Sequence, residues 1–280
     1  VSRINNLIKK IMKKLKFNGT IKEFHEKMKN DKRNLYKNEA ELKKDILKYK
    51  KIFNEEVVKK QFNIFPSSDY ILKKFNEDIA ESLPGGSYMP GSIYGPKRKG
   101  IFYYNSIIRP YKYDLPSLVL HEGNPGHHFQ CTISQDYKKV NFISLFHPSC
   151  VITFDEGWGL YCEGLYKYDD LLLEYGKLNS ELFRAIRLVV DTGIHEKKWS
   201  RDKVIKYMKD NLGHSDNDIE SEVNRYISDP GQCLCYKIGQ MEILKLKRKF
   251  LKNNSNNVKE FHTKFLENGE LPLSLLKRTF

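Results

Sequence analysis

The feature that most constrains this 280-residue chain is the segment LPSLVLHEGNPGHHFQ at residues 115–130. Apolar residues lead into it, and Pro116 suits the first turn of a helix. Burying a polar cluster directly after an apolar run is costly unless a cation compensates it. The segment therefore predicts a helix with a zinc site, built from four side chains that bind metals or transfer protons: His121, Glu122, His127 and His128.

The spacing of these histidines requires an interruption in the helix. In the zinc-peptidase pattern H-E-x-x-H, two imidazoles one turn apart bind one metal, and the Glu lies beside the bound water as general base. Here the later histidines follow His121 by six and seven residues, roughly 9 to 10.5 Å along an unbroken helix and too far for two bonds of ~2.0 Å to one ion. Pro125 removes an amide donor and clashes with the carbonyl of His121, and Gly126 permits unusual backbone angles. A bulge at residues 124–126 would return His127, or alternatively His128, to the metal.

A simpler alternative is a helix that ends at Pro125 and leaves the histidines on the surface or as caps. If the segment held a single histidine, we would favour this alternative. The combination of His, Glu, His and His after an apolar run favours the metal site instead.

The third metal ligand is expected from the segment TFDEGWGLYCE at residues 153–163. We favour Glu156, because the two glycines near it allow close helix approach and an early-turn carboxylate can point into a cleft. Alternatively, Glu156 has only a structural role and completes a capping box with Thr153. Glu163, two turns later, is a second candidate ligand, and Asp155 is a weaker one.

Further candidates for the active site lie in the C-terminal part of the chain. His195 ends an apolar helix over residues 181–195 and is either a hydrogen-bond donor to the reacting centre or a core histidine. Another long helix is expected to open at Asp229, with Pro230 in its first turn, and to run through Leu251. Around its start lies a group that could supply a phenol to an oxyanion and a cation to a substrate carboxylate: Arg225, Tyr226, Tyr236 and Lys237.

The pattern along the chain favours a mainly α fold with a small β-strand or hairpin element before the metal-binding helix. Residues 1–65 are expected to form a basic helical scaffold and residues 66–280 a catalytic region, within one continuous domain 1–280. The apolar stretch at residues 101–105 predicts a strand that lines the cleft and pairs with an extended substrate, with Tyr104 as a substrate-binding residue.

Charge and cysteine content limit the other classes of function. The net charge is +14, and residues 1–60 carry 19 Lys and Arg against 8 Asp and Glu. Because these lysines alternate with an apolar helical stripe, we interpret them as a solvated helix face and expect no nucleic-acid partner. No apolar run approaches the ~18 residues of a membrane span, and no signal peptide is visible, which slightly favours the cytoplasm. The five cysteines are expected to be reduced.

Four segments resemble signatures of a known family, in this order: HEGNPGHHFQ, FDEGWGLYCE, RAIRLVVDTGIHEKKWSRDKVIKYM and RYISDPGQCLCYKIGQ. The family is the domain of unknown function 885 family, which is itself similar to zinc peptidases of the carboxypeptidase Taq and thimet oligopeptidase type. The resemblance spans nearly the whole chain but corresponds to the C-terminal half of typical members. A separate N-terminal half or fragment would then complete the substrate cleft.

This resemblance implies a zinc-dependent metallopeptidase acting on a peptide substrate. Zinc would be bound by His121, His127 and Glu156, with His128 competing for the second position, and Glu122 would be the general base. The resemblance also implies a set of cleft residues: Tyr226, Tyr236, His195 and Arg225. The alternative is a catalytically inactive, metal-stabilised scaffold or binding protein of the same fold.

Overall fold

The computed structural model describes residues 1–92, 98–136, 151–253 and 257–280. It is mainly helical with one small sheet, which confirms the predicted fold class. The elements are α1 (Ser2–Lys14), α2 (Ile21–Asn30), α3 (Glu39–Phe53), α4 (Lys59–Gln61), β1 (Ile71–Lys74), β2 (Gly86–Met89), β3 (Ile101–Tyr104), α5 (Leu115–Glu122), α6 (His127–Asp136), α7 (Ile152–Glu163), α8 (Leu171–His195), α9 (Arg201–Asn211), α10 (Asp216–Ser228), α11 (Cys235–Asn253), α12 (Val258–Glu267) and α13 (Leu273–Leu276).

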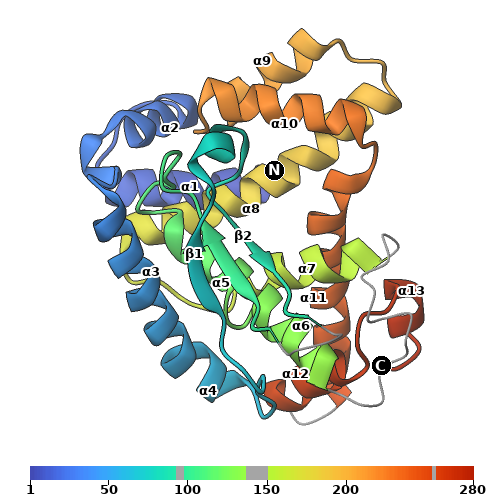
Figure 1. Ribbon diagram of the computed structural model, residues 1–280. Coiled ribbons are helices and arrows are strands. Elements are labelled where there is room, and N and C mark those ends of the chain that lie inside the picture. Colours follow the sequence, from blue (N-terminus) through green and yellow to red (C-terminus); the bar gives the residue numbers. More distant parts are fainter. Residues whose placement is uncertain (93–97, 137–150, 254–256) are drawn as a thin grey trace.

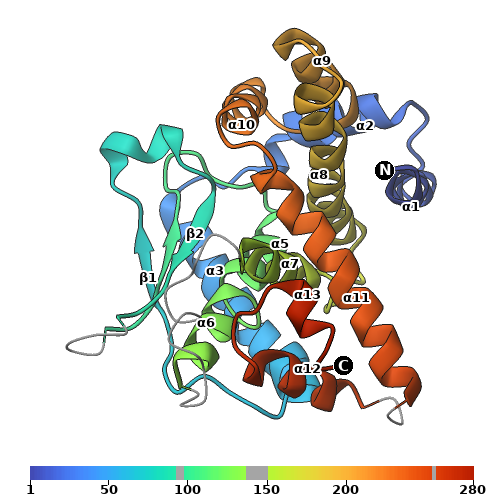
Figure 2. The same cartoon turned by 90° about the vertical axis from the view of Figure 1, so that its right-hand side faces the viewer.

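Helices α5 and α7 occupy the centre of the molecule. The three-stranded sheet lies on one side of them, and the long helices α8 and α11 lie on the other (Figure 1). The rotated view shows the same order, with the sheet and α11 on opposite sides of α5 and α7 (Figure 2). The helix that carries the first histidine is therefore enclosed on both sides.

The sheet has the order β1-β3-β2, with β3 parallel to β1 and antiparallel to β2. The predicted strand at residues 101–105 is confirmed as β3. Its predicted pairing with an extended substrate is wrong, because β3 is the central strand and both of its edges are already hydrogen-bonded. The strand at the edge near α5 is β2, which lies in the loop-rich part of the sequence and was not predicted.

Two tightly packed hydrophobic clusters hold the helices together. One joins α3, α5, α7 and α12 with the sheet, and the other joins α1, α8, α9 and α10. Residues 1–65 contribute side chains to both clusters. Four cysteines in the described residues are free thiols, and Cys150 falls outside the described residues. No helix in the described residues is long and apolar enough to cross a membrane.

Local capping signals located some helix ends correctly and missed others. Thr20 and Glu23 form the predicted capping box of α2, and Ser200 caps α9 as predicted. The expected helix start at Asp229 is wrong. The chain adopts a left-handed φ of 84° at Gly231, and a short 3-10 turn follows, so α11 begins only at Cys235.

Several histidines are buried as neutral rings. His262 Nε2 lies 2.6 Å from the Tyr161 hydroxyl, and its Nδ1 lies 2.8 Å from the Gln61 carbonyl oxygen. Burial lowers the pKa of His262 to about 3 and the pKa of His25 to about 4. Both rings therefore stay uncharged in the folded protein at neutral pH.

We expect this burial to make the protein less stable in mild acid. In the unfolded chain a histidine has a pKa near 6.5, so between about pH 6.5 and 4 the unfolded state binds more protons than the folded state. The stabilising effect is complete above pH 6.5 and is lost as the pH falls, at up to roughly 1.4 kcal/mol per pH unit for each histidine. Urea unfolding at pH 7.5 and 5.5 measures the difference, and a His262→Gln variant should show a shallower dependence. Equal pH dependences of the wild-type protein and this variant would contradict the prediction.

Candidate metal centre

The predicted interruption between the two histidine segments is present. Helix α5 ends at Glu122, and α6 begins at His127. The turn is held from outside, since Trp158 of α7 donates its indole N–H to the Pro125 carbonyl at 2.8 Å. A Cβ atom at Gly126 would lie 1.9 Å from the carbonyl oxygen of His121, so only glycine allows this close passage. The turn brings the start of α6 back beside the end of α5.

Three side chains converge where α5, α6 and α7 meet. Glu156 Oε2 lies 3.2 Å from His121 Nε2 and 3.5 Å from His127 Nε2. One ligand atom from each of these residues lies within 4.8 Å of the others. His121 is almost fully buried, whereas the side chains of His127 and Glu156 keep 14% and 19% of their exposure. Two imidazoles and one carboxylate with one accessible side are the donor set of a catalytic zinc site.

The geometry separates the alternatives that the sequence left open. His128 points elsewhere, because its Nδ1 lies 3.1 Å from the Tyr88 hydroxyl and its Nε2 lies 3.1 Å from the Ser68 carbonyl oxygen. Glu156 is not part of a capping box, since α7 begins at Ile152 without a side-chain cap. Within the described residues the converging group comprises His121, His127 and Glu156, without Asp155.

Glu163, the alternative third ligand, lies behind His121 instead. Its Oε1 is 2.8 Å from His121 Nδ1, and its Oε2 accepts a hydrogen bond from Ser180 Oγ at 2.5 Å. Arg184 in turn donates to Ser180 Oγ at 2.6 Å. A carboxylate that accepts the Nδ1 proton leaves the Nε2 lone pair free for a metal and fixes the ring orientation. Helix α7 thus supplies both a candidate ligand and the partner that orients another.

The charges of the cluster compensate one another. Burial alone would lower the pKa of His121, but hydrogen bonds to Glu156 and Glu163 outweigh it and raise this pKa to about 10. Burial would raise the pKa of Glu156, yet bonds to both imidazoles hold this pKa well below its usual range. With protein groups alone, protons on the imidazoles balance the carboxylates. A divalent cation would replace those protons, so metal binding should release them.

Glu122 lies beside the converging group but is not a member of it. Burial raises its pKa, and the charges of His127 and His121 oppose this rise. Its carboxylate also has a hydrogen bond to the backbone of Tyr88 on β2. A carboxylate with a raised pKa next to the metal-facing groups is suited to accept and return a proton.

Of the other predicted cleft residues, Tyr236 is the one in contact with this cluster. Its ring centre lies 6.2 Å from that of His121, with 24° between the ring planes. Burial raises its pKa, and the nearby carboxylate of Glu156 adds to the rise, so the phenol keeps its proton. Tyr236 therefore remains a candidate hydrogen-bond donor.

The remaining predicted residues are bonded elsewhere. Tyr226 donates its hydroxyl proton to Glu222 at 2.6 Å, and His195 Nε2 donates to the Tyr226 carbonyl oxygen at 2.9 Å. The other three residues have the following partners: Glu222 and Gln232 for Arg225, Glu181 and Gln240 for Lys237, and Glu39 for Tyr104. The structure does not bring these five residues to the converging group.

Two residues at this site were not identified from the sequence. Tyr88 contacts Glu122 through its backbone and His128 through its hydroxyl. It lies in a glycine-rich and proline-rich stretch without any periodic signal. Ser180 precedes Arg184 by one helical turn, but it lies one residue before the predicted helix 181–195, whereas α8 already begins at Leu171.

Gly159 provides a direct test of the site geometry. A Cβ atom there would lie 2.6 Å from Cε1 and 2.7 Å from Nε2 of His121, closer than real contacts allow. A Gly159→Ala variant should therefore push the imidazole out of position and weaken zinc binding by about 10-fold or more. Competition against a chromophoric chelator measures the affinity.

Gly164→Ala, at the C-terminal cap of the same helix, is the matched control. Its added Cβ would meet the Tyr161 carbonyl oxygen at 3.4 Å, an ordinary contact. This variant should bind zinc like the wild-type protein. Equal zinc affinities of the two alanine variants would show that His121 is not positioned as described.

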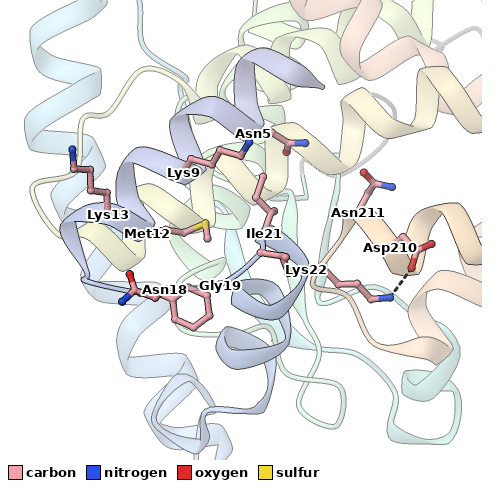
Figure 3. A pocket seen from close by; sticks show the side chains of 12 residues that line it. Asn5, Lys9, Met12, Lys13, Asn18, Gly19, Ile21, Lys22, Asp210 and Asn211 are labelled. Atoms are coloured by element: carbon pink, nitrogen blue, oxygen red, sulfur yellow. Dashed lines mark hydrogen bonds and ion pairs between the residues drawn. The ribbon is translucent and has the colours of Figure 1, made fainter.

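Two surface pockets lie away from the converging group. One of about 670 Å³ is formed by α1, α2 and the end of α9, where Lys22 pairs with Asp210 at 2.6 Å (Figure 3). The start of α2 there is already capped by Glu23, so it offers no free anion site. The other, of about 660 Å³, lies between α1, α8 and α11, and Glu163 is among the residues that line it. We assign no ligand to either pocket.

The fold and the site together define a class: a mainly helical protein in which two histidines and a glutamate from three helices form a candidate metal centre. The chain belongs to the family described as bacterial protein of unknown function (DUF885), whose model matches residues 1–279. This confirms the family that the sequence resembled. No curated protein matches the chain.

Two solved structures are similar to it. The putative lipoprotein from Colwellia psychrerythraea is 33% identical, with a TM-score of 0.91 over 99% of this chain and 49% of that one. A putative lipoprotein of unknown function from Shewanella oneidensis is 19% identical, with a TM-score of 0.79 over 99% of this chain and 54% of that one, and supports the fold alone. The chain spans about half the length of these proteins.

Proposed function

We propose that this protein is a zinc-dependent metallopeptidase. The observation that carries the proposal is the convergence of His121 Nε2, His127 Nε2 and Glu156 Oε2, with Glu122 directly beside them. Three protein ligands leave a coordination position for water or substrate, whereas structural zinc sites use four. Within the described residues the group has three members, which favours a catalytic centre over a structural one.

The residues of the chain would divide the chemistry of peptide hydrolysis between them. Zinc, when bound, supplies a Lewis acid and a water of lowered pKa. Glu122 accepts the proton of the attacking water and returns it to the leaving amine. The Tyr236 hydroxyl, which stays protonated, donates a hydrogen bond to the oxyanion that forms on the substrate carbonyl. Glu163 and Ser180 keep His121 in the tautomer that presents Nε2.

Digestion of a peptide library tests the proposal. The purified protein is analysed for metal, stripped with a chelator and reloaded with zinc, and cleavage is followed by mass spectrometry. We expect cleavage that is lost on chelation and restored by zinc. Stoichiometric zinc without cleavage of any library member would instead support the inactive, metal-stabilised scaffold.

The proposal also covers the substrate of the site and the part of the cleft that this chain does not supply. The substrate would be a peptide, and a further half or fragment would complete the cleft, since the chain spans about half of its solved relatives. The cytoplasmic location that the sequence favours finds no support in these relatives, which are described as putative lipoproteins.

A further inference from the structure

Two arginines of α8, Arg184 and Arg187, lie close to the ring of Tyr236. Arg187 Cζ is 4.4 Å from the centre of the Tyr236 ring, and Arg184 Cζ is 5.8 Å from it. Arg187 Cζ is also 4.2 Å from the ring centre of Phe183, so both aromatic rings contact this guanidinium. Because Tyr236 is itself next to His121, a single aromatic ring connects these cations to the candidate metal ligands.

Arg184 and Arg187 each have one N–H group without a hydrogen-bond acceptor among the described residues. Arg187 donates through Nε to the Tyr226 hydroxyl at 3.0 Å and through Nη2 to Glu222 at 2.8 Å. Its Nη1 has no partner among the described residues, although Arg187 is only 5% exposed. Arg184 Nε also lacks a partner, and its side chain is 18% exposed. Buried donors without acceptors are unfavourable. Both unpaired N–H groups are themselves closed to solvent, so a substrate anion would meet the pair at the exposed part of the Arg184 side chain.

The carboxylates nearest to Arg184 and Arg187 also bind other groups. Glu222 is bonded to both Arg187 and Arg225. Glu163 lies 3.7 Å from Arg184, but it also holds His121. Glu222 is thus shared by two guanidinium groups, and Glu163 is committed to the candidate metal centre. Guanidinium groups recognise carboxylates through paired, charge-assisted hydrogen bonds.

We infer that Arg184 and Arg187 form a subsite for a carboxylate of the substrate, with the partly exposed Arg184 outermost. The inference rests on the proposed peptidase function and names its substrate class: peptides that carry a free C-terminus or an acidic side chain shortly after the cleaved bond. The subsite lies within about 12 Å of the His121 ring centre, as the distances through the Tyr236 ring show, and an extended peptide at about 3.5 Å per residue spans this in about three residues. It replaces the predicted role of Arg225 and Lys237, whose donors are bonded to other residues.

Calorimetry on the zinc-loaded Glu122→Gln protein tests the subsite without turnover. The ligands are one peptide in three forms: with a free C-terminal carboxylate, with a C-terminal amide, and with the amide plus a glutamate after the cleavable bond. We expect the amide without glutamate to bind at least about 10-fold more weakly than one of the carboxylate forms. Which form binds tightly identifies the source of the carboxylate.

Variants of the arginines complete the test. In the same background, Arg187→Met and Arg184→Met should remove the preference for the carboxylate, whereas Arg225→Met should keep it. Zinc content and circular dichroism are measured for each variant. If Arg187→Met does not fold, Arg187→Lys, which keeps the charge but not the planar fork, should reduce the preference several-fold.

The outcomes distinguish this inference from the proposed function. A carboxylate preference that depends on Arg187, in a protein whose wild type cleaves no peptide, would support the subsite and overturn the peptidase. Chelator-sensitive cleavage with equal binding of all three peptide forms would overturn the subsite and support the peptidase. A preference that survives both methionine substitutions would also overturn the subsite.

Discussion

A Glu122→Gln variant should bind zinc like the wild-type protein and lose peptide hydrolysis by about 10²-fold or more. The amide has the same shape as the carboxylate but cannot accept the proton of the attacking water. Because Glu122 is outside the converging group of His121, His127 and Glu156, its replacement leaves the metal ligands in place. The amide oxygen can still accept the hydrogen bond from the Tyr88 backbone. The measurements are kcat on a peptide found by library digestion and zinc content by mass spectrometry.

A surface carboxylate provides the control for this substitution. Glu56 pairs with Lys60 on an exposed helical turn, so Glu56→Gln should keep both zinc and activity. Full activity of Glu122→Gln would eliminate the proposed mechanism, since no proton acceptor of comparable position was identified in the described residues. Loss of zinc in this variant would instead place Glu122 among the ligands.

The second large effect is expected from the two adjacent histidines. His127→Ala should abolish tight zinc binding, with a loss well beyond the 10- to 100-fold that is typical of groups behind the ligands. His128→Gln should retain zinc, because its ring nitrogens face Tyr88 and Ser68 rather than the converging group. Titration with zinc in the presence of a chelator gives both affinities.

Stability must be followed in both variants because both side chains are largely buried. His128 is fully buried and hydrogen-bonded, so His128→Gln should lower the melting temperature while leaving zinc affinity unchanged. His127→Ala should lose zinc affinity but change the melting temperature of the zinc-free protein less than His128→Gln does. If His128→Gln lost zinc and His127→Ala kept it, the assignment of the second ligand would be wrong.

The sequence was sufficient to predict the interruption of the helix at Pro125 and Gly126, because local chemistry decides it. It was not sufficient to choose between His127 and His128. That choice depends on how α6 is rotated after the turn, and the turn is fixed by Trp158 on a helix some thirty residues away. No local pattern contains this contact.

The roles of Glu156 and Glu163 were undecided for a similar reason. They lie seven residues apart on α7, so a helical pattern places them on the same face. Only the position of His121 against that face shows that Glu156 meets Nε2 and Glu163 meets Nδ1. Tyr226 and Lys237 were assigned to the cleft by proximity in sequence, but long-range partners on α8, Arg187 for Tyr226 and Glu181 for Lys237, determine where they lie.

Helix α7 contributes Glu156, Glu163 and Trp158, and these contact the first imidazole on two sides and the turn before the second. A shift of α7 would therefore displace Glu156 and disturb the positions of both candidate histidine ligands at the same time. Loss of metal should then be an all-or-none event coupled to detachment of α7, rather than a stepwise departure of single donors.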